Sequence, residues 1–313
     1  MPQRDLGSVT RVNRALSAYA KGEHARRSMR TIAGANPDAD SVLQRPFGVT
    51  IDWDGSVLIA DTYSNKIRKL DGNGRLTTIA GTGQQGFDGD GGLATQAKLN
   101  LPRAIAVNAK REIFIADADN NRIRKIDQQG IISTYAGTDT PGGADDKGRV
   151  RAVDVLLSGP HGVAVDQNGD VIIADTFNDR IRKIDREGFI TFIAGTDMPG
   201  LPDDEGRLRA VDAELSGPFG VAVDRDGNII VADTDNHMIR KIDLAGYITT
   251  IAGTVDEGSD GDNGPAVDAR LRTPSGVSVD RDGNLFIADT FNHLIRRARP
   301  RRCFVVSEFV AVG

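Results

Sequence analysis

Short apolar runs recur along the chain, and each is closed by a tight polar turn. One unit begins at a proline with "PHGVAVD", passes through "DQNGD", and continues with the apolar run "VIIADT". A second polar turn leads to "RIRKID", and "ITFIAG" completes the unit. Short β-branched runs separated by Asp, Asn and Gly turns are typical of strands joined by hairpins. Each unit therefore predicts four antiparallel strands.

The unit is written five times at a nearly constant period. The aspartates of its "IADT"-like run lie 56, 58, 58 and 56 residues apart. They are Asp61, Asp117, Asp175, Asp233 and Asp289. One four-stranded sheet cannot bury both of its faces, whereas sheets stacked radially cover one another. The continuous apolar runs of the second and fourth strands fit burial on both faces. The pattern predicts an all-β fold, a β-propeller of four-stranded antiparallel blades.

The units at the two ends of the chain are incomplete, so the ring can close in two ways. "RTIAG" at 30–34 is a fourth strand without a preceding unit, and the fifth unit ends at Arg299 without a fourth strand. Pairing these two closes five blades. Alternatively, "FVVSEFVAVG" at 304–313 completes the fifth blade, and "DLGSVTRVN" at 5–13, a degenerate copy of "DWDGSVLIADT", contributes to a sixth. We expect six blades with one degenerate, and closure with five blades is the alternative.

The repeated unit resembles the NHL repeat. The resemblance rests on "DNHMIRK" at 235–241 and "FNHLIRR" at 291–297, together with the recurring "P-x-G-V-x-V-D" and "I-A-G-T". It implies a propeller, commonly of six blades, but implies no activity by itself. We expect a degenerate or flexible N-terminal segment over residues 1–28, an NHL-repeat propeller over 29–299, and a C-terminal tail over 300–313 that supplies a ring-closing strand in one of the two solutions.

Composition narrows the choice of partner. The 313 residues carry a formal net charge of −5, so the chain as a whole has no electrostatic attraction to the phosphate backbone of a nucleic acid. No run approaches the roughly 18 apolar residues of a membrane span, and residues 1–30 lack the apolar core of a secretory signal. Cys303 is the only cysteine, which excludes an intramolecular disulfide. We expect a cytoplasmic monomer that binds a protein or peptide, with nucleic acid disfavoured.

One face of the predicted propeller collects the candidate binding residues. The loops between second and third strands share this face with the loops that link the blades, and variable loops on a rigid scaffold commonly bind partners. Besides the five repeated aspartates, it carries the residues four positions after them. These are Asn65, Asn121, Asp179, His237 and His293. Asp and Asn also bind turn backbones, so a purely structural interpretation stands beside the functional one.

Two interblade loops contain Asp-Gly-Asp triplets that suggest a metal. Asp88 and Asp90 lie in the first loop, and Asp260 and Asp262 lie in the second. Closely spaced carboxylates among glycines suit calcium, although the EF-hand spacing is missing. Calcium is the one cofactor that the sequence suggests. The alternative is that Asp90 and Asp262 begin short helices.

No local signature of catalysis stands out along the chain, because Ser-His-Asp, Cys-His and phosphate-loop patterns are missing. The sequence predicts a non-enzymatic protein-interaction scaffold that uses the variable loop face. The alternative is a metal-assisted lyase or hydrolase with calcium or zinc near the propeller axis, which the resemblance allows because related six-bladed propellers include such enzymes. Its nominated residues are His237 and His293, with the aspartates of the inner loops.

Overall fold

The computed structural model describes residues 32–33, 42–143, 149–196, 198–200 and 208–299. The chain divides into two units, residues 1–42 and residues 43–313. All strands of the described residues lie in the second unit. None of the described segments forms a helix long and apolar enough to cross a membrane.

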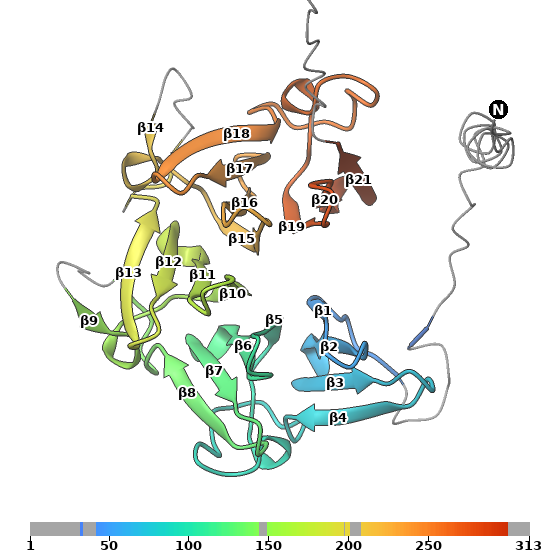
Figure 1. The fold of residues 1–313 in the computed structure, drawn as a ribbon, viewed down its shortest axis with the longest axis vertical. Coiled ribbons are helices and arrows are strands. Elements are labelled where there is room, and N and C mark those ends of the chain that lie inside the picture. Colours follow the sequence, from blue (N-terminus) through green and yellow to red (C-terminus); the bar gives the residue numbers. More distant parts are fainter. Residues whose placement is uncertain (1–31, 34–41, 144–148, 197, 201–207, 300–313) are drawn as a thin grey trace, which may run out of the picture. The chain divides into compact units, whose positions relative to one another are not determined.

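The described part of the second unit consists of five antiparallel sheets, the blades, arranged about a common axis (Figure 1). Blade 1 contains β1 (Val49–Ile51), β2 (Val57–Asp61), β3 (Lys66–Leu70) and β4 (Leu76–Ala80). Blade 2 contains β5 (Pro102–Val107), β6 (Ile113–Asp117), β7 (Arg122–Ile126) and β8 (Ile132–Ala136). Blade 3 contains β10 (Pro160–Val165), β11 (Val171–Asp175), β12 (Arg180–Ile184) and β13 (Phe189–Ala194). Blade 4 contains β15 (Pro218–Val223), β16 (Ile229–Asp233), β17 (Met238–Ile242) and β18 (Tyr247–Gly253). Blade 5 contains β19 (Pro274–Val279), β20 (Leu285–Asp289) and β21 (Leu294–Ala298).

The all-β propeller predicted from the repeat is confirmed, with consecutive strands paired in chain order in every blade. The first strands β1, β5, β10, β15 and β19 are innermost (Figure 1). The first hairpin turn needs a positive φ, which glycine adopts without strain. Gly169 takes a φ of 88° in blade 3, and in blade 2, where no glycine is present, Arg111 takes a φ of 62°.

The hydrophobic core of the described residues consists of four layers, one between each pair of consecutive blades. Successive residues of a strand point to opposite faces, so Phe114 packs towards blade 3 while Ile115 packs towards blade 1. Second strands are almost entirely buried, as predicted. Fourth strands are only partly buried, contrary to the prediction, because they lie at the periphery of the ring, and in blades 1 and 2 they are the outer edge of the sheet.

The interblade loops run along the outer edge of the next blade before they reach its first strand. β9 (Val150–Arg151) pairs with β13, and β14 (Leu208–Arg209) pairs with β18, so blades 3 and 4 gain a fifth short strand. Each loop then forms one turn of 3-10 helix. These turns are η2 (Ala94–Gln96), η4 (Ala152–Asp154), η6 (Ala210–Asp212) and η7 (Ala266–Asp268). The N-caps of η2 and η7 are Leu93 and Pro265, so the alternative that Asp90 and Asp262 begin these helices is wrong.

The faces at the two ends of the described ring are exposed. Ile295 in blade 5 is 75% exposed, whereas its four equivalents are fully buried. At the other end, Val49 is 66% exposed, whereas its equivalent Ile105 is only 6% exposed. The sequence segments that would build a sixth blade, 5–13 and 304–313, and the strand 30–34 of the five-bladed alternative lie almost wholly outside the described residues. Both solutions for ring closure stay predictions.

Candidate functional site

The five repeated aspartates lie beneath the loop face, and all are fully buried. In blade 3, Asp175 Oδ1 accepts the Ser158 backbone N–H at 2.7 Å, which ties the incoming interblade loop to the blade. Asp175 Oδ2 accepts the Asn178 side-chain amide at 2.8 Å and the Arg182 Nε–H at 2.6 Å. The arginines of this network are also buried in blades 1 to 4, which therefore enclose an Asp–Arg ion pair, while the equivalent Arg296 of blade 5 is only partly buried.

Burial dominates the electrostatics of these carboxyl groups. It raises the pKa of Asp175 to about 7, against the opposing effects of the Asn178 and Ser158 hydrogen bonds. Burial likewise raises the pKa of Asp117 and of Asp233 to about 6. Enclosed carboxyl groups with hydrogen bonds to their own loop cannot reach a partner, so these aspartates hold the loops in place.

The second ring of candidate residues connects neighbouring blades. Asn65, Asn121, Asp179 and His237 all take left-handed backbone conformations, which places their side chains against the next blade. Their side chains accept backbone N–H groups of Leu101, Gly159, Gly217 and Thr273, at 2.9, 3.0, 2.7 and 3.2 Å. His293 takes the same conformation in blade 5. Neither His237 nor His293 lines the axial cavity described below.

The carboxylates nominated for calcium face arginines. Asp90 Oδ1 lies 2.5 Å from Arg124 Nη2, and Asp262 Oδ1 lies 2.7 Å from Arg296 Nη2. In the loop of blade 2, Asp88 contributes its backbone carbonyl to Arg124 at 3.5 Å, while in the other loop the Asp260 carboxylate lies 3.7 Å from the Arg270 guanidinium. Across the described ranges, no three His, Cys, Asp or Glu side chains gather as metal ligands would. Calcium at these loops stays a prediction.

A group of residues that the sequence interpretation missed lies at the centre of the loop face. The residue after the opening proline varies between blades, with four residue types in five blades, although the rest of that run is nearly uniform. In chain order these residues are Phe47, Arg103, His161, Phe219 and Ser275. All five line one cavity of about 490 Å³ on the propeller axis. Variation at one fixed position of a uniform repeat is the signal that could have revealed them.

The members of this axial group contact one another in pairs. The His161 ring lies 4.3 Å from the Phe219 ring and 5.3 Å from the Phe177 ring, measured between centroids. The Arg103 guanidinium lies over the Phe47 ring, 5.0 Å from its centroid. Burial and the nearby Arg103 charge lower the pKa of His161 to about 3, so this imidazole is neutral at physiological pH.

Three exposed aromatic side chains surround the axial group on alternate blades. They occupy the turns between second and third strands, which form η1 (Thr62–Ser64), η5 (Thr176–Asn178) and η8 (Thr290–Asn292). Tyr63 is 47% exposed, Phe177 is 67% exposed and Phe291 is 62% exposed. A Cβ at Gly159 would lie 2.4 Å from the Phe177 ring, so glycine at this position lets the ring lie across the first strand. The loop face thus presents aromatic side chains on blades 1, 3 and 5, which alternate with the exposed Asp119 and Asp235 at the same position of blades 2 and 4.

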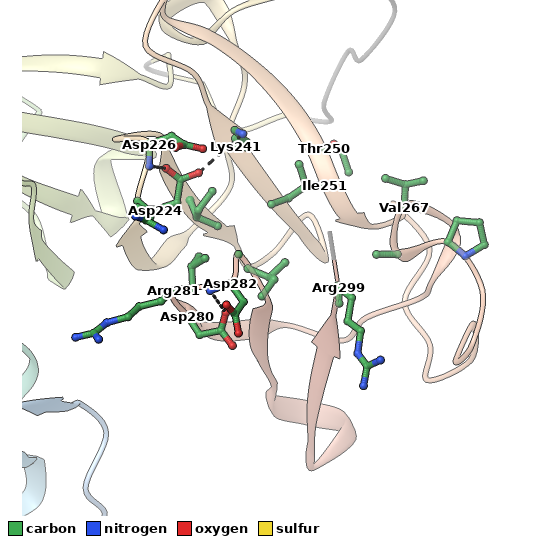
Figure 2. A pocket seen from close by; sticks show the side chains of 18 residues that line it. Asp224, Asp226, Lys241, Thr250, Ile251, Val267, Asp280, Arg281, Asp282 and Arg299 are labelled. Atoms are coloured by element: carbon green, nitrogen blue, oxygen red, sulfur yellow. Dashed lines mark hydrogen bonds and ion pairs between the residues drawn. The ribbon is translucent and has the colours of Figure 1, made fainter. Parts of the chain in front are cut away.

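A larger cavity of about 720 Å³ lies between blades 4 and 5 (Figure 2). Ile230, Ile251, Leu285 and Ala298 line it, with Lys241 and Asp224 at one side. In the other blades a fourth strand fills this space, and Ile132, Ile190 and Ile248 pack into the corresponding layers. Blade 5 has three strands among the described residues, and this cavity lies where the fourth strand packs in the other blades.

Similarity to known proteins agrees with the fold. The sequence profile of the Teneurin NHL domain matches residues 83–145 and 192–260, and that of the NHL repeat matches 157–184 and 271–297. Teneurin-4 of Homo sapiens is 31% identical over 285 residues, which cover 80% of this chain but 10% of Teneurin-4. The chain therefore spans about a tenth of this relative's length.

Solved structures show the same architecture. A streptogramin B lyase structure has a TM-score of 0.52 and 20% identity, covering 87% of this chain and 72% of the lyase chain. A chain of a nidogen–laminin complex has a TM-score of 0.55 and 17% identity, covering 82% of this chain and 76% of that one. At these identities the likeness shows the β-propeller fold alone. With the matching profiles, the chain is an NHL-repeat β-propeller protein related to the NHL domains of teneurins.

Proposed function

We propose that this propeller is a protein-interaction scaffold that binds a protein or peptide on its loop face. The observation that carries the proposal is the set of exposed aromatic side chains around the axis, Tyr63, Phe177 and Phe291. Aromatic residues are enriched at protein interfaces because they bury a large area at a low cost in conformational entropy. Three of them on one face of a rigid ring make a preformed binding surface.

The rigidity of the face supports the same function. Buried aspartates such as Asp175 bind the interblade loop through a hydrogen bond. The residues four positions after these aspartates, such as Asn65, bind the next blade in the same way. A surface that is ordered before binding loses little entropy on association. The described residues do not gather His237 and His293 with a third metal ligand, so the metal-assisted lyase or hydrolase alternative has no structural support here.

The test replaces the three aromatic residues together, as Tyr63→Ser, Phe177→Ser and Phe291→Ser. A partner purified with the wild-type protein is identified, produced separately and titrated against both proteins by calorimetry. Losing interface aromatics typically costs about 2 kcal/mol or more each, so binding should weaken at least about a hundredfold.

The matched control is Leu244→Ser, which removes an exposed apolar side chain from the turn between the third and fourth strands, on the opposite face. Unchanged binding by the triple variant, or weakened binding by the control alone, would contradict the proposal.

A further inference from the structure

The axial cavity differs in charge from the rest of the molecule. The chain carries a net charge of −5, yet no aspartate or glutamate is among the described residues that line this cavity. Of these lining residues, Arg103 alone is charged. The cavity therefore combines a single positive charge with apolar walls that include Phe47, Phe219 and Phe286.

Arg103 is held in place without a counter-charge. Its guanidinium stacks on Phe47, and its Nε is enclosed with no hydrogen-bond partner. Among the described residues Arg103 makes no ion pair, in contrast to the arginines of the third strands. Its terminal nitrogens are not enclosed, so they remain available as the paired donors that arginine presents to a carboxylate.

His161 supplies a neutral donor beside this charge. The imidazole is buried, and its Nδ1 is enclosed without a partner. We assign the proton to Nε2, because an enclosed Nδ1 with no acceptor nearby gains nothing by carrying it. A neutral imidazole with its proton on Nε2 donates a hydrogen bond and adds no second charge.

We infer that the axial cavity is a binding site for a carboxylate attached to an apolar body, with Arg103 and His161 as donors and the phenylalanine rings as walls. A volume of about 490 Å³ suits such a ligand, since small-molecule sites are mostly apolar with a few placed polar groups. The inference rests on the proposed function in placing the ligand on the binding face. It adds the chemistry that the centre of that face recognises.

Three blocked amino-acid probes test the site by calorimetric titration. N-acetylphenylalanine carries a free terminal carboxylate, N-acetyl-aspartyl-phenylalanine amide carries a side-chain carboxylate, and N-acetylphenylalaninamide carries neither. At least one acidic probe should bind about tenfold or more tightly than the neutral probe, because hydrogen bonds to charged groups are the strong ones. Preference for the first indicates a free acid or chain terminus, and preference for the second indicates an acidic side chain of a protein partner.

Variants separate the site from a general effect of charge. Arg103→Met should remove the advantage of the acidic probe and leave binding of the neutral probe unchanged. Arg75→Met removes an exposed arginine from a turn on the opposite face and should change neither. Equal binding of all three probes, or an acidic advantage that survives Arg103→Met, would overturn the inference. Probe binding by a double variant, Tyr63→Ser with Phe291→Ser, which keeps Phe177 beside His161, makes this result independent of partner binding.

Discussion

Removal of the buried Arg124 charge should destabilise blade 2 in a pH-dependent way. Arg124 is fully buried, and its Nη1 lies 3.3 Å from Asp117 Oδ2 while its Nη2 lies 2.5 Å from Asp90 Oδ1. It also reaches the carbonyl oxygens of Lys98 and Asp88 in the preceding loop. Arg124→Met keeps much of the side-chain volume but leaves Asp117 enclosed without a counter-charge. Breaking a buried pair in this way costs about 3–5 kcal/mol in the free energy of unfolding.

The pH dependence follows from Asp117. Burial raises its pKa from 3.8 to about 6, so the folded protein binds this proton more tightly than the unfolded chain does. A carboxyl group with a raised pKa contributes stability at low pH, and that contribution falls as the pH rises through the folded value. Loss of the Arg124 charge raises this pKa further. The deficit of the variant should therefore be larger near pH 8 than near pH 5, by about 1–3 kcal/mol at 1.36 kcal/mol per pH unit.

Urea unfolding followed by far-UV circular dichroism at both pH values measures this deficit. Arg75→Met is the exposed control and should lie within about 0.5 kcal/mol of wild type. The double variant Asp117→Asn with Arg124→Met no longer encloses an unpaired charge, so it should recover part of the loss near pH 8. A deficit that is the same at both pH values, or no larger than that of the control, would refute this assignment of Asp117 and Arg124.

Three further outcomes follow from the packing of the ring. Gly195→Ala places a Cβ against the Asp179 carbonyl oxygen and should lower the melting temperature far more than Gly130→Ala, where φ is similarly positive but nothing lies within 4 Å of the added Cβ; equal losses would contradict the close approach. Both ring closures predicted from the sequence pack another blade on Ile295, so Ile295→Ala should cost the roughly 2–5 kcal/mol expected for the fully buried Ile181→Ala, and a cost well under this in urea unfolding would show that no blade covers Ile295. Calcium bound at Asp90, as the sequence predicts, should raise the melting temperature at millimolar concentration, and Asp90→Asn should abolish this rise; no rise would contradict that prediction and leave Asp90 in its ion pair with Arg124.

The periodic sequence predicts most of the fold. The "IADT" run, its turn and the "IRKID" run recur with the same polarity, so the second and third strands of each blade could be placed from the pattern alone. The partial burial of the fourth strands could not be, because an apolar run does not reveal that it forms the outer edge of a sheet. β9 and β14 could not be predicted either, since two residues carry no periodic signal.

Only part of the candidate site could be predicted from the sequence. The repeated aspartates were candidates because the same residue occurs in every unit. A residue that is constant within a repeat commonly stabilises the repeat itself, and Asp175 is indeed buried and hydrogen-bonded to its own loop. Arg103 and His161 belong to a position that varies between blades and has no local motif. They meet only because five first strands converge on one axis, a relation that joins residues in different repeats.

Site-specific photo-crosslinking tests the loop-face account most directly. A photoreactive phenylalanine analogue is placed at Phe177 on the loop face in one protein and at Leu244 on the opposite face in another, and each is irradiated in the native cell. The account predicts a discrete covalent adduct with a partner protein at position 177 and none at position 244, with binding of that partner confirmed by calorimetry. An adduct at position 244 with none at position 177 would contradict it.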